Sequence, residues 1–316
     1  MCSFRSRIVT GDTVEVLPKL SRKHKFDVVI ADPPYNIGKD FGSNWDQMPL
    51  ENYVSWTKEW LGECLDLLKD TGVVYIYGFP EILAHVSVLF PVDEQRWLQW
   101  HYTNKTVPGS TFWQRSHESI LCLWKPGWKR PQLEIDQIRE PYTEQFLRNA
   151  AGKERAGTPS RFGSTGKRTI YVVHENGAMP RDVIKVPALA GGAGRSERWF
   201  LCRSCGGSIH PPAELKLHKD HDVLKHPTQK PKELTRRLLK SRVNGSGGRV
   251  LIPFAGSGSE CVVAQELGIS FLGIEINPEY ASFAWQWLYT EKTGAANVQI
   301  DWQDAPEIRE RFEEIS

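Results

Sequence analysis

Hydrophobic residues follow two rhythms over the first third of the chain. Short apolar runs bounded by turn residues predict buried strands, which lie at 7–10, 26–31, 72–78, 97–103 and 119–124. Apolar residues at helical spacing predict helices, which lie at 13–20, 50–69 and 81–90. Strands interleaved with helices indicate a mostly parallel, doubly wound α/β sheet.

The same alternation returns near the end of the chain. Helices are expected at 232–241, from the glycine turn after residue 252 to residue 267, and at 278–292. Strands are expected at 249–252 and 270–276, which brings the sheet to seven strands. Between them the rhythm is absent: only 169–173 is strand-like, and 191–194 (Gly-Gly-Ala-Gly) is expected to be a flexible loop. We therefore expect one domain in two halves, 1–126 and 226–316, with an insert at 127–225.

Charge is segregated along this chain. The net charge is only +2, but the stretch from Arg148 to Arg203 holds eleven Lys or Arg against four acids. That stretch carries +7 and the remainder −5, which predicts a surface for a polyanion. A solvated loop face is the alternative.

Composition restricts the cellular setting. No apolar run approaches the roughly 20 residues that span a membrane, and the first 25 residues lack a signal-peptide core. We expect a cytoplasmic protein with no membrane partner. Its six cysteines are then expected to be thiols or metal ligands rather than disulfides.

A glycine turn joins the predicted strand 249–252 to the next helix. In Phe254-Ala255-Gly256-Ser257-Gly258 the glycines allow a ligand to approach the backbone, and the helix N-terminus offers free N–H groups. Glu275 ends the following strand, where a carboxylate can accept hydrogen bonds from ribose hydroxyls. The pattern indicates a nucleoside-bearing cofactor, and the missing third glycine argues against NAD. A turn shaped only by packing is the alternative.

A second turn, Asp32-Pro33-Pro34-Tyr35, follows the buried strand 26–31. Its prolines stiffen the backbone and remove two donors, which leaves the Asp32 carboxylate and the Pro33 carbonyl as acceptors. Such an array suits an amino group, because acceptors on its hydrogens turn the nitrogen lone pair toward an electrophile. A proline-rich surface turn is the alternative.

These motifs resemble those of a known family. Residues 32–35 are similar to the D-P-P-Y motif of DNA amino-methyltransferases, residues 254–258 to their F-x-G-x-G motif, and 226–231 (His-Pro-Thr-Gln-Lys-Pro) to the segment before it. Catalytic motif first and cofactor motif last is the circularly permuted order of the β class. The resemblance covers 6–126 and 224–292 and implies a Rossmann-like methyltransferase fold around a target-recognition insert.

The resemblance implies roles for matching residues. Asp32 and Pro33 hold the target amine within a motif completed by Pro34, and Tyr35 stacks on the base. The implied cofactor is S-adenosyl-L-methionine, with Asp12 near its adenine and Lys230 near its methionine end. The remaining implied contacts are Phe254, Ala255, Gly256, Ser257, Gly258 and Glu275.

The implied reaction is in-line methyl transfer to a base flipped out of duplex DNA. A leading aspartate favours adenine N6, and cytosine N4 is the alternative. Methylation of RNA or of a protein glutamine amide, and a non-catalytic zinc-bearing adaptor that binds nucleic acid, are the rival readings. A cognate restriction endonuclease is a further expected partner, and monomer and homodimer both stay open.

The insert contains potential metal ligands. Cys202 and Cys205 form a C-x2-C pair, and His218 and His221 follow after twelve residues, as paired zinc ligands do. His210 is the substitute ligand, and unbound thiols near surface histidines are the alternative. The insert also lies where the family carries target recognition, so we expect DNA contacts among Trp113, Trp128, Arg161, Arg168, Arg195 and Arg198.

Overall fold

The structure is a computed structural model that describes residues 4–38, 46–105, 111–156, 168–245 and 247–291. The chain divides into two compact units, a larger one of 1–133 with 182–316 and a smaller one of 134–181. Both boundaries of the smaller unit lie inside the expected insert 127–225. None of the helices in the described ranges is long and apolar enough to cross a membrane.

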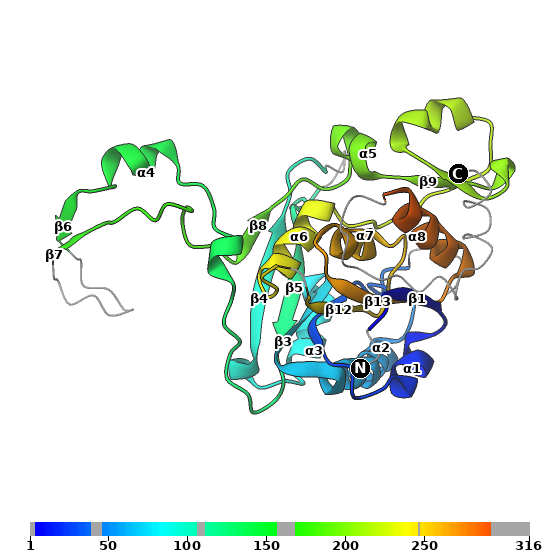
Figure 1. Ribbon diagram of the computed structural model, residues 1–316, viewed down its shortest axis with the longest axis horizontal. Helices are drawn as coiled ribbons and strands as arrows, with labels where there is room; N and C mark the ends of the chain where they lie inside the picture. The colour runs from blue at the N-terminus through cyan, green and yellow to red at the C-terminus, as the bar shows by residue number, and fades with distance from the viewer. Residues whose placement is uncertain (1–3, 39–45, 106–110, 157–167, 246, 292–316) are drawn as a thin grey trace. The chain divides into compact units, whose positions relative to one another are not determined.

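The larger unit is built on an eight-stranded sheet (Figure 1). Its strands, in spatial order, are β1 (Arg7–Thr10), β13 (Ser270–Glu275), β12 (Arg249–Ile252), β2 (Phe26–Ala31), β3 (Leu68–Gly78), β5 (His117–Leu123), β4 (Gln95–His101) and β8 (Val183–Lys185). Strands β1, β13, β12, β2 and β3 run parallel, while β5 is antiparallel to both of its neighbours. The expected mostly parallel α/β fold is confirmed.

The eighth strand was missed by the sequence pattern. Strand β8 comes from the expected insert and pairs in parallel with β4. It has three residues, of which only Ile184 is buried, so it offers no measurable periodicity. A second difference lies at Leu68, where the backbone is already extended and β3 begins inside the range expected to be helical.

Helices cover both faces of the sheet. On one face lie α1 (Thr13–Val16), α2 (Leu50–Leu67) and α3 (Pro80–Ser87), and on the other α6 (Lys232–Lys240), α7 (Ser259–Glu266) and α8 (Pro278–Thr290). Successive residues of β2 enter opposite cores: Val28 and Ile30 pack with α6–α8, and Val29 and Ala31 pack with α2 and α3. Because each face is buried, the strand is a continuous apolar run from Val28 to Ala31.

Residues 191–224 form a smaller module of the larger unit. It contains α5 (Gly191–Glu197), then β9 (Phe200–Cys202), the 3-10 turns η5 (Arg203–Cys205) and η6 (Pro212–His218), β10 (Ser208–His210) and β11 (Val223–Leu224). The prediction of a flexible loop at 191–194 is wrong, because these residues open α5. A Cβ at Gly194 would lie 2.9 Å from the Leu189 carbonyl oxygen, so this glycine allows a close backbone packing.

The smaller unit, 134–181, contains η4 (Ile135–Gln137), α4 (Glu144–Asn149) and a hairpin of β6 (Glu154–Ala156) and β7 (Arg168–Ile170). Strand β7 overlaps the strand expected at 169–173. Within this unit Tyr142 stacks on Phe146, and the exposed apolar side chains include Leu147, Ile170 and Val172.

Candidate active site

The two motif turns meet at one edge of the sheet. Strands β1, β13, β12 and β2 are parallel, so their carboxyl ends lie together and bring Asp12, Glu275, Phe254 and Asp32 to a common cavity. The cavity has about 1050 Å³ of empty space, part of it open to solvent. All the residues predicted for catalysis and cofactor binding line it except Gly258.

Glu275 holds the glycine turn in place. Its Oε2 accepts a hydrogen bond from the Gly256 backbone N–H at 2.7 Å, and its Oε1 accepts one from Asn277 N–H at 2.8 Å. Gly256 has φ +53°, a left-handed conformation that favours glycine. Burial raises the pKa of Glu275, while the backbone donors stabilise its charged form. Ile276 N–H is a third backbone donor, and the carboxylate keeps at least one lone pair for a ligand.

Gly258 faces a helix rather than the cavity. Its φ is +82°, and a Cβ at this position would lie 2.6 Å from the Ala284 Cβ on α8. This glycine therefore allows α7 and α8 to pack closely.

Asp12 and Thr13 line the cavity and hold the segment after β1 in place. Asp12 caps α1, its Oδ1 accepting from the Val14 N–H at 2.9 Å. The Thr13 hydroxyl donates to the Pro253 carbonyl, so the segment after β1 is joined to the start of the glycine turn.

Asp32 has one paired and one unpaired oxygen. Its Oδ2 accepts from Lys230 Nζ at 2.7 Å. Its Oδ1 is buried and has no hydrogen-bond partner in the described part of the chain. Burial raises the pKa of Asp32, and the Lys230 charge acts in the opposite direction. A buried acceptor without a donor costs free energy, so this oxygen is suited to a ligand donor.

Lys230 forms a buried ion pair with Asp32. Its side chain is 2% exposed, and Nζ is 2.7 Å from Asp32 and 3.8 Å from a Glu118 oxygen. The same ammonium lies 5.1 Å from the ring centroid of Tyr35 and 5.1 Å from that of Tyr77. Burial opposes the ammonium charge, but the Asp32 and Glu118 carboxylates prevail and raise the pKa of Lys230.

Tyr35 is buried and bonded through its hydroxyl. The ring lines the cavity, and the hydroxyl donates to Glu118 Oε2 at 3.0 Å. Phe79 contacts the ring edge-on, with centroids 5.3 Å apart. Glu118 and Phe79 therefore hold the Tyr35 ring in a fixed orientation.

Two buried acids of this site were missed by the sequence motifs. Glu118 opens the antiparallel strand β5, whose start lies at the same edge as the end of β3. Glu260 follows the glycine turn on α7 and lines the cavity, and burial raises its pKa to about 7. A carboxylate inside the apolar segments 117–123 and 259–266 is the signal that could have found them.

The predicted metal ligands also come together. The ligand atoms of Cys202, Cys205, His218 and His221 all lie within 4.8 Å of one another. His210 lies beside this group, where its Nδ1 is 3.1 Å from Glu214 Oε2.

The predicted DNA contacts have different environments. Trp113 is 88% exposed and Trp128 is half-exposed, and Arg168 and Arg195 are also exposed. Arg198 instead donates to the His226 carbonyl at 2.7 Å and so supports the segment that lines the cavity. Arg161 lies outside the described residues.

Known proteins with similar sequences are methyltransferases. The chain is 27% identical over 299 residues to the type II methyltransferase M.HpaI of Haemophilus parainfluenzae, covering 92% of this chain and 77% of that one. It is 28% identical over 277 residues to the DNA adenine methyltransferase YhdJ of Escherichia coli K12, covering 86% and 79%.

Solved structures share the fold. The cytosine-N4-specific PvuII DNA methyltransferase superposes with a TM-score of 0.60 at 13% identity, covering 99% of this chain and 94% of that one. M1.HpyAVI in its complex with SAM superposes with a TM-score of 0.52 at 17% identity, covering 89% and 98%.

A family model spans most of the chain. The model described as a DNA methylase, of the N6/N4 methyltransferase type, matches residues 26–286. This range contains the Asp32 turn, the Lys230 segment, the glycine turn and Glu275. The chain thus belongs to the N6/N4 DNA methylase family and is a DNA amino-methyltransferase.

Proposed function

We propose that this protein transfers a methyl group from S-adenosyl-L-methionine to adenine N6 in duplex DNA, as a member of the permuted β class. The observation that carries this proposal is the buried, unpartnered Asp32 Oδ1 in the same cavity as the glycine turn. An acceptor that needs a donor lies beside a site suited to a nucleoside.

The cofactor half of the cavity fits a nucleoside with a cationic tail. Glu275 and Asp12 offer carboxylates to ribose and adenine groups, and Ile276 is a half-exposed apolar side chain on the lining that can contact a ring. Asp32, which the Lys230 ammonium favours as a carboxylate, adds negative charge near the transferred group. S-adenosyl-L-methionine supplies an electrophilic methyl group on a sulfonium. The SAM complex of M1.HpyAVI, which shares the fold, supports this assignment.

The amine half of the cavity orients a weak nucleophile. In the proposed reaction Asp32 Oδ1 and the Pro33 carbonyl accept the two amine hydrogens, so the nitrogen lone pair turns toward the methyl carbon. A nitrogen–carbon bond forms as the carbon–sulfur bond breaks, and the sulfur retains the bonding electrons. The nitrogen then loses one proton along its hydrogen bond to Asp32 and on to solvent. Orientation is the main contribution of the protein.

Lys230 keeps Asp32 in the state that this role requires. Burial alone favours the protonated carboxyl, which would lose an acceptor. The ammonium at 2.7 Å favours the carboxylate and occupies Oδ2, leaving Oδ1 to the amine. Tyr35, oriented by Glu118, offers its ring to the flipped base.

The choice of adenine is supported by the leading aspartate of the 32–35 motif and by the E. coli relative, a DNA adenine methyltransferase. Cytosine N4 is the second candidate, because the PvuII enzyme with the same fold is specific for it. We assign target recognition to residues within 127–225, where exposed basic residues can hold phosphates and the unit 134–181 adds exposed apolar side chains.

The proposal is tested by the product on a defined duplex and by Asp32→Ala. The mass spectrum of digested nucleosides should show N6-methyladenine. Asp32→Ala should lower kcat by about 100- to 1000-fold, since one oriented acceptor is lost. DNA affinity should change little, because phosphate contacts outside the cavity dominate it.

Asp32→Asn is the matched control, because it keeps one oxygen acceptor but loses the charge paired with Lys230. Its rate should lie between those of wild type and Asp32→Ala. N4-methylcytosine as the product would overturn the base assignment alone. Wild-type turnover by Asp32→Ala would overturn the mechanism.

A further inference from the structure

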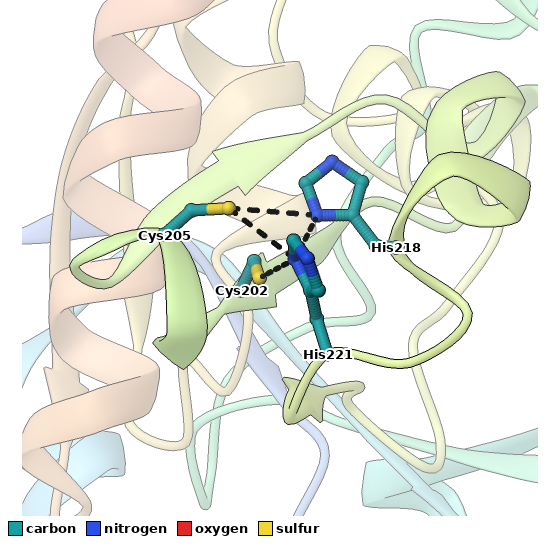
Figure 2. A group of neighbouring side chains, drawn as sticks. All are labelled: Cys202, Cys205, His218 and His221. Carbon is teal, nitrogen blue, oxygen red and sulfur yellow. Dashed lines mark hydrogen bonds between the residues drawn. The ribbon is translucent and has the colours of Figure 1, made fainter.

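Four side chains from short elements converge in the module 191–224 (Figure 2). Cys202 ends β9, Cys205 ends η5, His218 ends η6, and His221 precedes β11. Figure 2 shows both sulfurs and the two histidine Nδ1 atoms turned toward one point. Cys202 is fully buried and His218 is nearly so.

The separations fit a tetrahedral ion. Zinc bonds of about 2.3 Å to sulfur and 2.0–2.1 Å to nitrogen require about 3.5 Å between sulfur and nitrogen and about 3.3 Å between two nitrogens. Cys202 Sγ and Cys205 Sγ each lie 3.4 Å from His221 Nδ1, and Cys205 Sγ lies 3.7 Å from His218 Nδ1. The two Nδ1 atoms are 3.2 Å apart.

The donor set also fits zinc chemically. Two thiolates and two neutral imidazoles balance a dication without leaving net charge in a partly buried site. Sulfur and nitrogen donors in a tetrahedron are typical of structural zinc, whereas Ca²⁺ and Mg²⁺ require oxygen ligands. All four positions are filled by protein, which leaves none for a reacting water.

We propose that Cys202, Cys205, His218 and His221 bind one structural zinc ion. The ion joins β9, η5, η6 and β11, whose strands of two or three residues are too short to be stable alone. It therefore adds cross-links to a module whose buried apolar side chains include Phe200 and Leu201 of β9.

The module supports one wall of the cavity. Arg203 donates two hydrogen bonds to the Glu279 carboxylate on α8 in a bidentate contact, at 2.7 and 2.8 Å. Gln286 on α8 donates to the Gly207 carbonyl at 2.7 Å and accepts from Ile209 N–H at 3.1 Å. Strand β11 then leads directly into His226–Lys230, which lines the cavity. We infer that zinc holds in place the segment that brings Lys230 to Asp32, an inference that rests on the proposed function.

His210 is the matched control for the ligand set. Its ring lies 4.1 Å from that of His218, yet its Nδ1 is paired with Glu214 and it is not one of the four convergent donors. A substitution at His210 perturbs the same module while leaving the proposed ligands in place.

Elemental analysis of the full chain, purified without chelator, tests the site. The expected content is about one zinc per chain in wild type and His210→Ala, and a loss of most of it in Cys205→Ser and His221→Ala. A ratio near zero in wild type would refute the proposal. So would zinc lost in His210→Ala and kept in His221→Ala.

Cobalt substitution of wild type keeps the test independent of variant folding. Cobalt(II) should give the strong visible absorption of a tetrahedral thiolate site, and weak octahedral bands would count against the geometry. Chelator should then expose 199–226 to protease and weaken methyl-donor binding. If zinc is present but donor binding survives its removal, the metal site stands and its link to the cavity is wrong.

Discussion

The cavity and the Cys/His cluster are assembled in different ways. Asp12, Asp32, Lys230 and Glu275 are far apart in sequence and are brought together by the parallel sheet. The cluster is formed by twenty consecutive residues with little sheet around them. In the cavity, the sheet backbone determines where the reactive side chains lie. In the cluster, we expect the binding of the four side chains to one ion to hold the short backbone segments in place. A substitution in the cavity should change reactivity or charge balance, and one in the cluster should change folding.

The largest expected effect tests whether the cavity depends on its buried cation. Lys230→Ala removes the ion-pair partner of Asp32 and the positive charge that lies 3.8 Å from Glu118, so both buried carboxylates lose their compensating charge. The free energy of unfolding should fall by about 3–5 kcal/mol, measured by urea titration. Zinc content should stay that of wild type, since the cluster does not include this residue.

Lys69→Ala is the control for Lys230. It breaks the partly exposed pair with Asp27 at 2.8 Å and should cost only about 0–1 kcal/mol. Equal losses in the two variants would contradict a special role for the buried pair.

Glu260 should make the stability of the cavity depend on pH. Burial raises its pKa to about 7 from 4.5, so the folded chain holds this proton more tightly than the unfolded chain. Its stabilising contribution is complete below pH 4.5 and is lost as the pH rises through 7, a change of about 3 kcal/mol. Glu260→Gln should remove that change, seen as a stability gain over wild type at pH 8 but not at pH 5. A constant difference between the two proteins would show that Glu260 ionises normally.

The smallest effect concerns the orientation of Tyr35. Tyr35→Phe keeps the ring but removes the hydrogen-bond donor to Glu118, so a buried acceptor loses a partner. The free energy of unfolding should fall by about 1–3 kcal/mol. Because the ring also loses its anchor, turnover should fall while some activity survives.

Tyr53→Phe provides the comparison for Tyr35, since Tyr53 donates to the neutral Pro34 carbonyl at 2.8 Å. Its loss should be nearer to 1 kcal/mol. If Tyr35→Phe matches wild type in both stability and turnover, Glu118 does not position the ring.

The sequence predicted features that depend on local pattern. The strands of the main sheet and the two turns after β2 and β12 follow from periodicity and from glycine and proline chemistry. Glu118 could not be placed, because its position depends on β5 running antiparallel to β3. The packing role of Gly258 against Ala284 and the addition of β8 are likewise tertiary. The Cys/His cluster was accessible from sequence because its ligands are close in the chain.

The pairing of β1 with β13, in which Arg7 is registered with Leu272, has a consequence for synthesis. Strand β12 also lies between β13 and β2, so the central part of the sheet closes only after the last quarter of the chain is made. At a translation rate of about 5–20 residues per second, β2 waits roughly 10–50 s with an unpaired apolar edge. More than half of the residue contacts in the structure are long-range in sequence. Folding on the ribosome should therefore be slow and should depend on chaperones that shield strand edges.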